Sequence, residues 1–278
     1  DLPIETYDLV INDFEPVSAW ACSMKHKTCI GLSHQAAVIS KKSPKPKKKD
    51  LMGKAILLNY APVTGAYGFH FEAYEKTIYK PVIRSQIRNA IPSDKKHFCV
   101  YLPAYADKRI IKILGEIKNI EWQVFSKRAG KEYKEKNMHI RPVQNDAFVE
   151  SLIHCSGIIC GAGFETPAEA LFLKKKLLVI HMKGQYEQQC NAAAAKKLGI
   201  PVLKSLKKKH LGAIKEWTGR AQTVHVDYPD QTESILDMII RKHGNEKRKP
   251  SQPLGDSIHS VKKLKEKSLG EILNQLSD

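Results

Sequence analysis

Segment 157–199 restricts the fold more than any other part of this sequence. Residues 158–161 form a short apolar run typical of the end of a buried strand, and a tight glycine-containing turn follows it. A helix is predicted to begin at Thr166-Pro167, because a hydroxyl suits the N-cap and proline suits the first helical position. A second buried strand is predicted at residues 177–180, and an alanine-rich helix ends at Gly199. This order predicts a βαβα unit of a parallel sheet.

The two loops of this unit lie on the same edge of the predicted sheet, beyond the carboxyl ends of its strands. Ligands of open α/β sheets bind at that edge, and free N–H groups at a helix start attract anions. The first loop offers a phosphate site made of Gly161, Gly163, Phe164, Glu165 and Thr166. The second, predicted as a polar segment over 184–191, offers sugar-binding side chains at Gln185, Glu187, Gln188, Gln189 and Asn191. An ordinary βαβα unit with a solvated glutamine face remains an open alternative.

Length and composition indicate a globular protein of about two domains. The chain has 278 residues, of which 42% are hydrophobic and 27% are charged. No run approaches the roughly 18 apolar residues that span a membrane. The six cysteines form no CxxC pair, and most lie in apolar surroundings, which is typical of buried thiols in a reducing compartment. We therefore expect a cytoplasmic protein without a metal site.

The formal net charge of +17 predicts an acidic partner. Lysines gather in loops and in the tail, most densely in segment 41–49, and no aromatic residues interleave with these clusters. Nucleic-acid binding is disfavoured, because single-strand binding surfaces combine basic and aromatic side chains. Phosphorylated substrates and an anionic membrane surface fit the charge better, so a peripheral membrane location is one expectation.

The N-terminal segment is predicted to form one βαβ step, with strands at 7–11 and 28–32 and a helix at 17–25. Asp13 and His34 then fall at the carboxyl ends of neighbouring parallel strands, where catalytic groups of α/β domains gather. Both are candidate catalytic residues. A turn aspartate and an ordinary loop histidine are the open alternatives.

From residue 97 onwards, predicted strands alternate with helices of about 10–15 residues, which indicates a doubly wound parallel sheet. Segment 80–96 contains two prolines and several polar residues and is predicted to be the linker. The predicted organisation is an acceptor-side domain at 1–90, a donor-binding domain at 97–245 and a tail helix at 246–278.

The turn and helix of segment 157–199, with its ETPAEAL and KGQYEQQCNA blocks, resemble the donor-binding half of GT-B glycosyltransferases. The resemblance is closest to the group that includes the lipid-II-forming N-acetylglucosaminyltransferase (family 28). It implies two Rossmann-like domains that face each other. It also implies that Glu169 holds the ribose hydroxyls, that residues 163–166 face the diphosphate, that Gln188 and Gln189 read the sugar, and that turn 141–148 cups the base. A capping box from Thr166 to Glu169 is the alternative role of that glutamate.

Residues 9–14 resemble the strand whose aspartate orients a catalytic histidine in natural-product glycosyltransferases, and residues 31–35 resemble the next strand with its acceptor-facing loop. The family's first strand, with its glycine-rich loop, is expected well before Tyr7 and is not in this sequence. We therefore expect the N-terminal domain to be incomplete, either because the chain is a fragment or because the domain is reduced; a fragment would be inactive alone. The loop at 103–106 also lacks the family's glycine–serine pattern.

The resemblance implies an inverting, metal-independent transfer of sugar from a nucleotide-sugar donor, a UDP-sugar, to an unidentified acceptor, with no cofactor. The acceptor is a lipid-linked or other hydroxyl compound at an anionic membrane surface, and His34, or a histidine upstream of this sequence, is the implied base. Two other functions stay open. One is epimerisation of a nucleotide sugar by the same fold, and the other is a non-enzymatic basic adaptor for anionic polymer or membrane.

Overall fold

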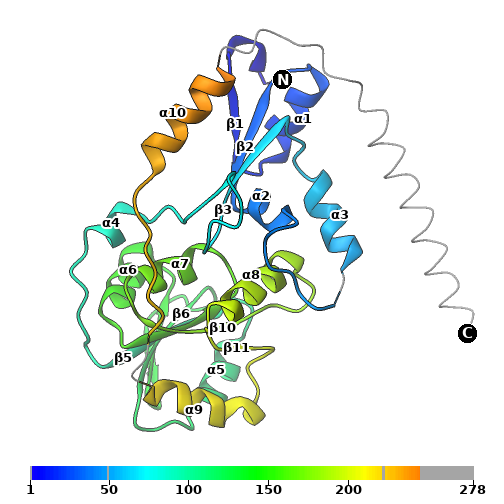
Figure 1. The fold of residues 1–278 in the computed structure, drawn as a ribbon. Coiled ribbons are helices and arrows are strands. Elements are labelled where there is room, and N and C mark those ends of the chain that lie inside the picture. The colour runs from blue at the N-terminus through cyan, green and yellow to red at the C-terminus, as the bar shows by residue number, and fades with distance from the viewer. Residues whose placement is uncertain (1, 49, 221–222, 245–278) are drawn as a thin grey trace, which may run out of the picture.

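The computed structural model describes residues 2–48, 50–220 and 223–244, which form two β-sheets with helices around them (Figure 1). The first sheet has the order β1-β2-β3-β4, and all its neighbours are parallel. Its strands are β1 Val10–Asn12, β2 Cys29–Ser33, β3 Gly65–Phe69 and β4 Ile78–Tyr79. The helices around it are η1 Ile4–Thr6, α1 Pro16–Met24, α2 His34–Ile39, α3 Leu51–Asn59 and α10 Thr232–His243.

The predicted N-terminal βαβ step is confirmed, but α2 was not anticipated. The hydroxyl of Ser33 accepts a hydrogen bond from the N–H of Ala36 and caps this helix. α2 lies so close to β3 that a Cβ on Gly68 would stand 2.5 Å from the backbone N of Ala37. Glycine is therefore required at that position for close packing between the helix and the strand.

Helices cover both faces of the first sheet. Cys29 and Ile30 are neighbours in β2, so their side chains point to opposite faces. Cys29 packs with Cys22 of α1, whereas Ile30 packs with Ile235 and Ile239 of α10. α10 follows the second sheet in the chain and yet lies beside the first (Figure 1). The domain boundaries expected from the sequence stay a prediction.

The second sheet has the order β11-β10-β9-β5-β6-β8-β7, and it is parallel except for β7, which runs antiparallel to β8. Its strands are β5 His97–Tyr101, β6 Glu121–Ser126, β7 Tyr133–Glu135, β8 Met138–Pro142, β9 Gly157–Gly161, β10 Lys176–Ile180 and β11 Val202–Leu203. Its helices are α4 Ser85–Arg88, α5 Asp107–Leu114, α6 Asn145–His154, α7 Glu165–Phe172, α8 Tyr186–Lys197, η2 Lys208–His210 and α9 Leu211–Gly219. The predicted doubly wound parallel topology is confirmed.

The strand order reverses between β5 and β9. From β5 the chain proceeds through β6 to β8 on one side, and from β9 through β10 to β11 on the other. In doubly wound sheets the ligand crevice lies at this switch point, outside the carboxyl ends of the two strands. The fold therefore directs attention to the residues that follow Tyr101 and Gly161.

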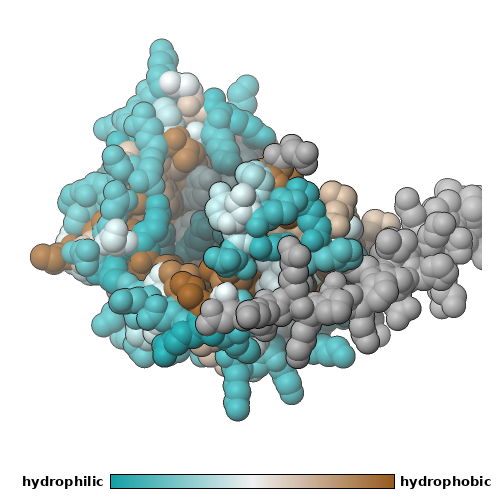
Figure 2. All heavy atoms as spheres, turned by 90° about the horizontal axis from the view of Figure 1, so that it is seen from above, coloured by the Kyte–Doolittle hydropathy of each residue, from teal (hydrophilic) through white to brown (hydrophobic). Residues whose placement is uncertain are grey.

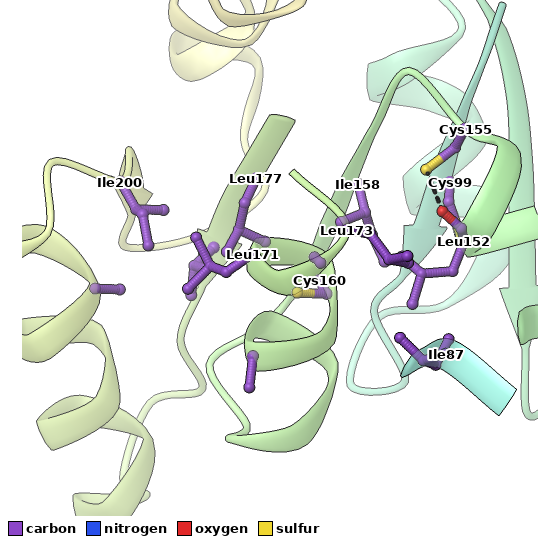
Figure 3. Packing of buried hydrophobic residues seen from close by; sticks show 14 of the residues in the cluster. Ile87, Cys99, Leu152, Cys155, Ile158, Cys160, Leu171, Leu173, Leu177 and Ile200 are labelled. Atoms are coloured by element: carbon purple, nitrogen blue, oxygen red, sulfur yellow. Dashed lines mark hydrogen bonds between the residues drawn. The ribbon is translucent and has the colours of Figure 1, made fainter. Parts of the chain in front are cut away.

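Two hydrophobic clusters fill the faces of the second sheet. Alternate residues of each strand enter opposite clusters, as the pleat requires; in β9, Ile158 and Cys160 join one and Ile159 joins the other. α6, α7 and α8 cover the first face, where Leu171, Leu177 and Ile200 pack together (Figure 3). α5 and α9 cover the second. Because helices cover both faces of the sheet, the β9–α7 turn lies at the edge formed by the carboxyl ends of the strands.

Two expected helix starts were wrong. α7 begins at Glu165 with Phe164 at its N-cap and no side-chain cap, so Thr166 is inside the first turn and the capping box with Glu169 does not form. α8 begins at Tyr186, so Gln188 and Asn191 belong to the helix rather than to a polar loop. The expected tail helix at 246–278 lies outside the described residues.

The N-terminal end of α8 reaches across to the first sheet's helices. Tyr186 and Cys190 of α8 are buried in one cluster with Val38 of α2 and Leu57 of α3. A Cβ on Gly53 would come within 2.6 Å of the Tyr186 Cβ, so the approach is close. α8 therefore joins the two halves of the molecule.

Candidate functional site

A cleft of about 880 Å³ lies where the two sheets face each other with the carboxyl ends of their strands. Both halves contribute to its lining, which comprises Asp13, Phe14, Leu32, His34, Gln35, Tyr60, Phe69, Val82, Tyr101, Gly163, Phe164, Glu165, Thr166 and Glu187. The structure thus brings together seven of the residues predicted for the site: Asp13, His34, Gly163, Phe164, Glu165, Thr166 and Glu187. The lining contains three carboxylates and no lysine or arginine.

The β9–α7 turn presents free backbone to this cleft. A Cβ built on Gly161 or Gly163 would have no atom within 4 Å, so space is open beside both residues. The first N–H groups of α7 lack a side-chain cap and carry the positive end of the helix dipole. This combination suits an oxyanion of a phosphate that approaches between the glycines and Thr166.

Phe164 closes the inner end of the cleft by stacking on His34. The two rings are parallel within 3° at a centroid distance of 3.9 Å. Phe71 lies 5.5 Å from the Phe164 ring, and His70 meets it edge-on at 6.2 Å. Phe164 therefore acts as a packing residue between the two halves, in addition to lining the cleft.

His34 is the first residue of α2 and is buried, with both ring nitrogens engaged. Nδ1 lies 2.8 Å from the carbonyl oxygen of Phe69, and Nε2 lies 2.9 Å from Oδ1 of Asn191, so both ring nitrogens face oxygens that accept. Nδ2 of Asn191 donates to the carbonyl of Ala162. Burial lowers the pKa of the His34 imidazole. His34 thus links α2, α8 and the β9–α7 turn.

Asp13 also lines the cleft and is exposed. The next residue, Phe14, has φ of 55°, a left-handed backbone that non-glycine residues rarely adopt and that often marks functional turns. The ring nitrogens of His34 bond to Phe69 and Asn191 rather than to Asp13. In this geometry the carboxylate and the imidazole are therefore neighbours along one cleft and not a hydrogen-bonded pair.

Glu169 is held by an arginine that the sequence analysis did not assign to the site. Arg84 Nε and Nη2 donate to the two carboxylate oxygens of Glu169 at 2.5 and 2.8 Å, and Nη1 donates to Asn145 Oδ1 at 2.7 Å. The hydrogen bonds that Arg84 donates to Glu169 raise the pKa of Arg84. Glu169 is outside the cleft lining, and its carboxylate is covered by the guanidinium.

The amide side chains of α8 do not line the cleft. Gln188 Oε1 accepts from the N–H of Met182 at 3.0 Å and so closes the β10–α8 turn on itself. Gln185 is the N-cap residue of α8 without a side-chain cap bond, and Gln189 is half-buried one turn later. Glu187 is the α8 residue that reaches the lining, where it accepts from Gln35 at 3.3 Å.

Several lining residues carried weak signals in the sequence. Tyr101 ends β5 at the switch point, so its position follows from the strand pattern, although the sequence analysis did not name it. Phe69 ends β3 within an aromatic segment at 66–72, a composition that can line a cleft, whereas Val82 comes from the linker, where no local pattern distinguishes it. Among residues 2–48, 50–220 and 223–244, no group of three metal-binding side chains comes together. No helix in those ranges is long and apolar enough to span a bilayer.

Comparisons with solved structures agree with this arrangement. The structure of UGT89C1 from Arabidopsis thaliana complexed with UDP matches at a TM-score of 0.54 and 14% identity, over 90% of this chain and 71% of that one. The structure of UGT2 from Phytolacca americana, complexed with UDP-2fluoro-glucose and pterostilbene, matches at a TM-score of 0.50 and 11% identity. The match covers 94% of this chain and 76% of that one. Two facing Rossmann-like sheets with a cleft between them define a GT-B fold. No curated protein matches the sequence.

The family comparison covers both halves of the molecule. The profile described as glycosyl transferase family 1 matches residues 5–218, from η1 to α9. This range includes every residue of the cleft lining and the whole β9–α7 turn. The chain belongs to glycosyl transferase family 1.

Proposed function

We propose that this chain transfers a sugar from a nucleotide-sugar donor, a UDP-sugar, to an acceptor hydroxyl. The observation that carries the proposal is the uncapped start of α7 beside open glycine backbone at the switch point of the second sheet. That edge shares one cleft with Asp13 and His34 of the first half. UDP in particular is suggested by the UDP complexes of the two similar structures.

In the proposed reaction the acceptor O–H loses its proton as its oxygen attacks the anomeric carbon, and the bond from that carbon to the diphosphate breaks. The leaving diphosphate faces the N–H groups of Glu165 and Thr166, whose fixed dipoles stabilise the charge that develops. The proposal assigns this stabilisation to the helix start rather than to a metal. We expect EDTA to leave turnover unchanged.

Asp13 and His34 are the candidates for the proton acceptor. Asp13 is exposed in the cleft, whereas His34 can accept a proton only after Nε2 leaves Asn191. Asp13→Asn and His34→Gln, made separately, test the two. The variant that loses the base should fall in kcat by about 100-fold or more while its affinity for UDP is kept. If both variants keep their kcat, the proton is taken elsewhere.

The donor site is tested by thermal shift with UDP and UDP-sugars on matched glycine variants. A Cβ at Gly163 and one at Gly212 of α9 both meet open space, so leucine should be tolerated at either position. UDP should raise the Tm of the wild-type protein and of Gly212→Leu, but not that of Gly163→Leu. An undiminished shift in Gly163→Leu would remove the donor site from this turn.

The same proteins and ligands also distinguish transfer from the two rival functions. If no nucleoside diphosphate raises the Tm of the wild-type protein, the basic adaptor replaces the enzyme. If a UDP-sugar is converted to its epimer without an acceptor, the reaction is epimerisation and not transfer. Release of UDP that depends on an added acceptor supports transfer.

The acceptor proposal rests on an exposed apolar face at the mouth of the cleft. On α1, the side chains of Val17, Trp20 and Met24 are exposed at helical spacing, and the exposed fraction of Met24 is 72%. On α3, the exposed apolar residues are Leu51, Met52, Ile56 and Leu58. Trp20 Nε1 donates to the carbonyl of Tyr60 just beyond α3, so the two helices adjoin. Tyr60 itself lines the cleft. Apolar side chains also reach the surface in the view from above (Figure 2).

The sequence segment that carries this apolar face is rich in lysine. Between Glu15 and Glu72 the sequence contains nine lysines and one acidic residue, Asp50. Apolar side chains bordered by cations suit the boundary of an anionic bilayer. This supports a lipid-linked acceptor at such a surface, a peripheral membrane location, and the closer resemblance to the lipid-II-forming group.

Vesicle sedimentation tests the membrane part separately from catalysis. The full-length protein should sediment with phosphatidylglycerol vesicles and not with phosphatidylcholine vesicles. Met24→Ser with Leu51→Ser should weaken this binding, whereas Ile91→Ser, at an 87% exposed linker residue, should not. Equal binding by all variants would remove this face from the proposal and leave the donor site untouched.

A further inference from the structure

The guanidinium of Arg84 contacts two parts of the chain that are predicted, from the family resemblance, to bind the nucleoside of the donor. Arg84 donates to both oxygens of Glu169, the predicted ribose ligand, and to Oδ1 of Asn145. Asn145 lies in turn 141–148, which is predicted to cup the base. A ribose diol bound by Glu169 would need the same carboxylate oxygens that Arg84 occupies.

Burial shows which partner covers the other. The side chain of Glu169 is 4% exposed, whereas that of Arg84 is 44% exposed. The guanidinium therefore lies between the carboxylate and solvent. The pair is bidentate and charge-assisted, the geometry that gives arginine–carboxylate pairs their strength. A ribose diol can reach Glu169 only after this side chain has moved.

The backbone beneath Arg84 is fixed on both sides. Ile83 and Ile87 are buried in the same cluster as Leu152 of α6. Figure 3 shows Ile87 of α4 pointing towards Leu152. The residue before Arg84 and the turn after it are thus anchored to the second sheet. Release of Glu169 requires rotation of the Arg84 side chain towards solvent, without movement of the linker.

We propose that Arg84 is a latch on the donor site: its guanidinium competes with the donor's ribose diol for the carboxylate of Glu169. This inference rests on the proposed function, because it needs a nucleotide donor at β9 and α7. It adds a residue from the linker that limits donor affinity and selects donors whose ribose carries both hydroxyls.

Removal of the latch should tighten binding for a physical reason. Without Arg84, the buried carboxylate of Glu169 has lost its charged partner, and an unpaired buried acceptor is costly. The two hydroxyls of a ribose restore hydrogen bonds to it. A nucleotide without these hydroxyls cannot do so and gains nothing from the change.

The experiment compares UDP with 2′,3′-dideoxyuridine diphosphate on the full-length protein by calorimetry. Arg84→Met should bind UDP about tenfold more tightly than the wild-type protein, while its affinity for the dideoxy nucleotide stays within about twofold. Arg88→Met is the matched control. Arg88 lies four residues later and donates to the carbonyl of Tyr228 instead of Glu169. It should change neither affinity.

A double-mutant cycle assigns the effect to the pair. Glu169→Gln should weaken UDP binding, and Arg84→Met should produce no further tightening in that background. Arg84→Lys, which keeps the charge but not the two-pronged contact, should lie between wild type and Arg84→Met. It also serves if Arg84→Met proves too unstable to measure.

Each remaining outcome has one meaning. Weaker or unchanged UDP binding by Arg84→Met and Arg84→Lys would overturn the latch, since a competitor cannot be removed without gain. Equal tightening for the dideoxy nucleotide would also overturn it. If no variant binds UDP at all, the proposed donor function fails as well. If UDP binds in a Gly163-dependent manner without an Arg84 effect, only the latch fails.

Discussion

At the residue scale, buried histidines couple the stability of this protein to pH. His70 is fully buried beside His34, and burial, with the nearby His34 and Lys45, lowers its pKa to about 2. Burial also lowers the pKa of His34 and that of His97. These bases take up protons in the unfolded chain before they do so in the folded protein. Folding is therefore favoured above their ordinary pKa of about 6.5 and weakens as the pH falls below it.

We predict that the free energy of unfolding decreases below pH 6.5, and that His70→Asn makes the decrease shallower. An asparagine oxygen can replace Nδ1 as acceptor for the N–H of Phe71, which His70 serves at 2.9 Å. One group well below its unfolded pKa contributes about 1.4 kcal/mol per pH unit. The free energy of unfolding is measured with urea at pH 7.5 and at pH 5, and the difference is taken within each protein. A loss of packing caused by the substitution affects both pH values and cancels in this difference. If the free energy of unfolding decreases equally from pH 7.5 to pH 5 in the wild-type protein and in His70→Asn, the prediction is wrong.

At the element scale, α10 ties the C-terminal part of the described chain to the first sheet. Ile239 is fully buried with Ile30 and Tyr67, whereas its neighbour Ile240 is 53% exposed. The two positions share one helix and one residue type, and burial is what distinguishes them. They therefore form a matched pair for measuring what α10 contributes.

Ile239→Ala should lower the free energy of unfolding by about 2–4 kcal/mol, because it leaves a cavity between α10 and the sheet. Ile240→Ala should change it by less than about 0.5 kcal/mol. Chemical denaturation followed by circular dichroism measures both. Similar effects at the two positions would mean that α10 does not pack against the first sheet in solution.

The same scale separates the two loops of the βαβα unit. The β9–α7 turn keeps open space at Gly161 and Gly163, so it remains available to a ligand. The start of α8 is instead occupied by contacts with α2 and α3 through Tyr186. A segment that is predicted to bind sugar thus also joins the halves of the molecule, and its sugar binding stays a prediction.

At the scale of the whole molecule, α8 and α10 bind the two sheets into one cooperative unit. α8 shares a buried cluster with α2 and α3, and α10 crosses back to β2 and β3. His34 adds a buried link through Asn191 and Phe164. One buried cluster is therefore shared by both halves of the described chain, beside clusters that belong to a single sheet.

We therefore predict a single unfolding transition for both sheets. In Trp20→Phe, fluorescence reports only Trp122 and Trp217, which are buried at the second sheet. The urea midpoint of the transition followed by tryptophan fluorescence should coincide with the midpoint followed by far-ultraviolet circular dichroism, which reports the whole chain. A circular dichroism signal that is lost at lower urea than the tryptophan signal would show that the first sheet unfolds separately.

The sequence by itself determined the regular elements of the second sheet and the place of its ligand edge. Its strands β5, β9 and β10 contain continuous apolar runs, and helical segments separate them, so local pattern and final structure agree. The parallel order then placed Gly161 and Gly163 at the carboxyl ends. Asp13 and His34 were predicted by the same logic, and both line the cleft.

Only the tertiary structure decided which residues meet across the molecule. Arg84 and Glu169 are 85 positions apart, and His34 and Asn191 are 157 apart. Such pairs leave no periodic signal, because a side chain's partner across a fold is set by the packing of whole elements and not by its neighbours in sequence. For the same reason α10 could not be assigned to the first sheet before the fold was known.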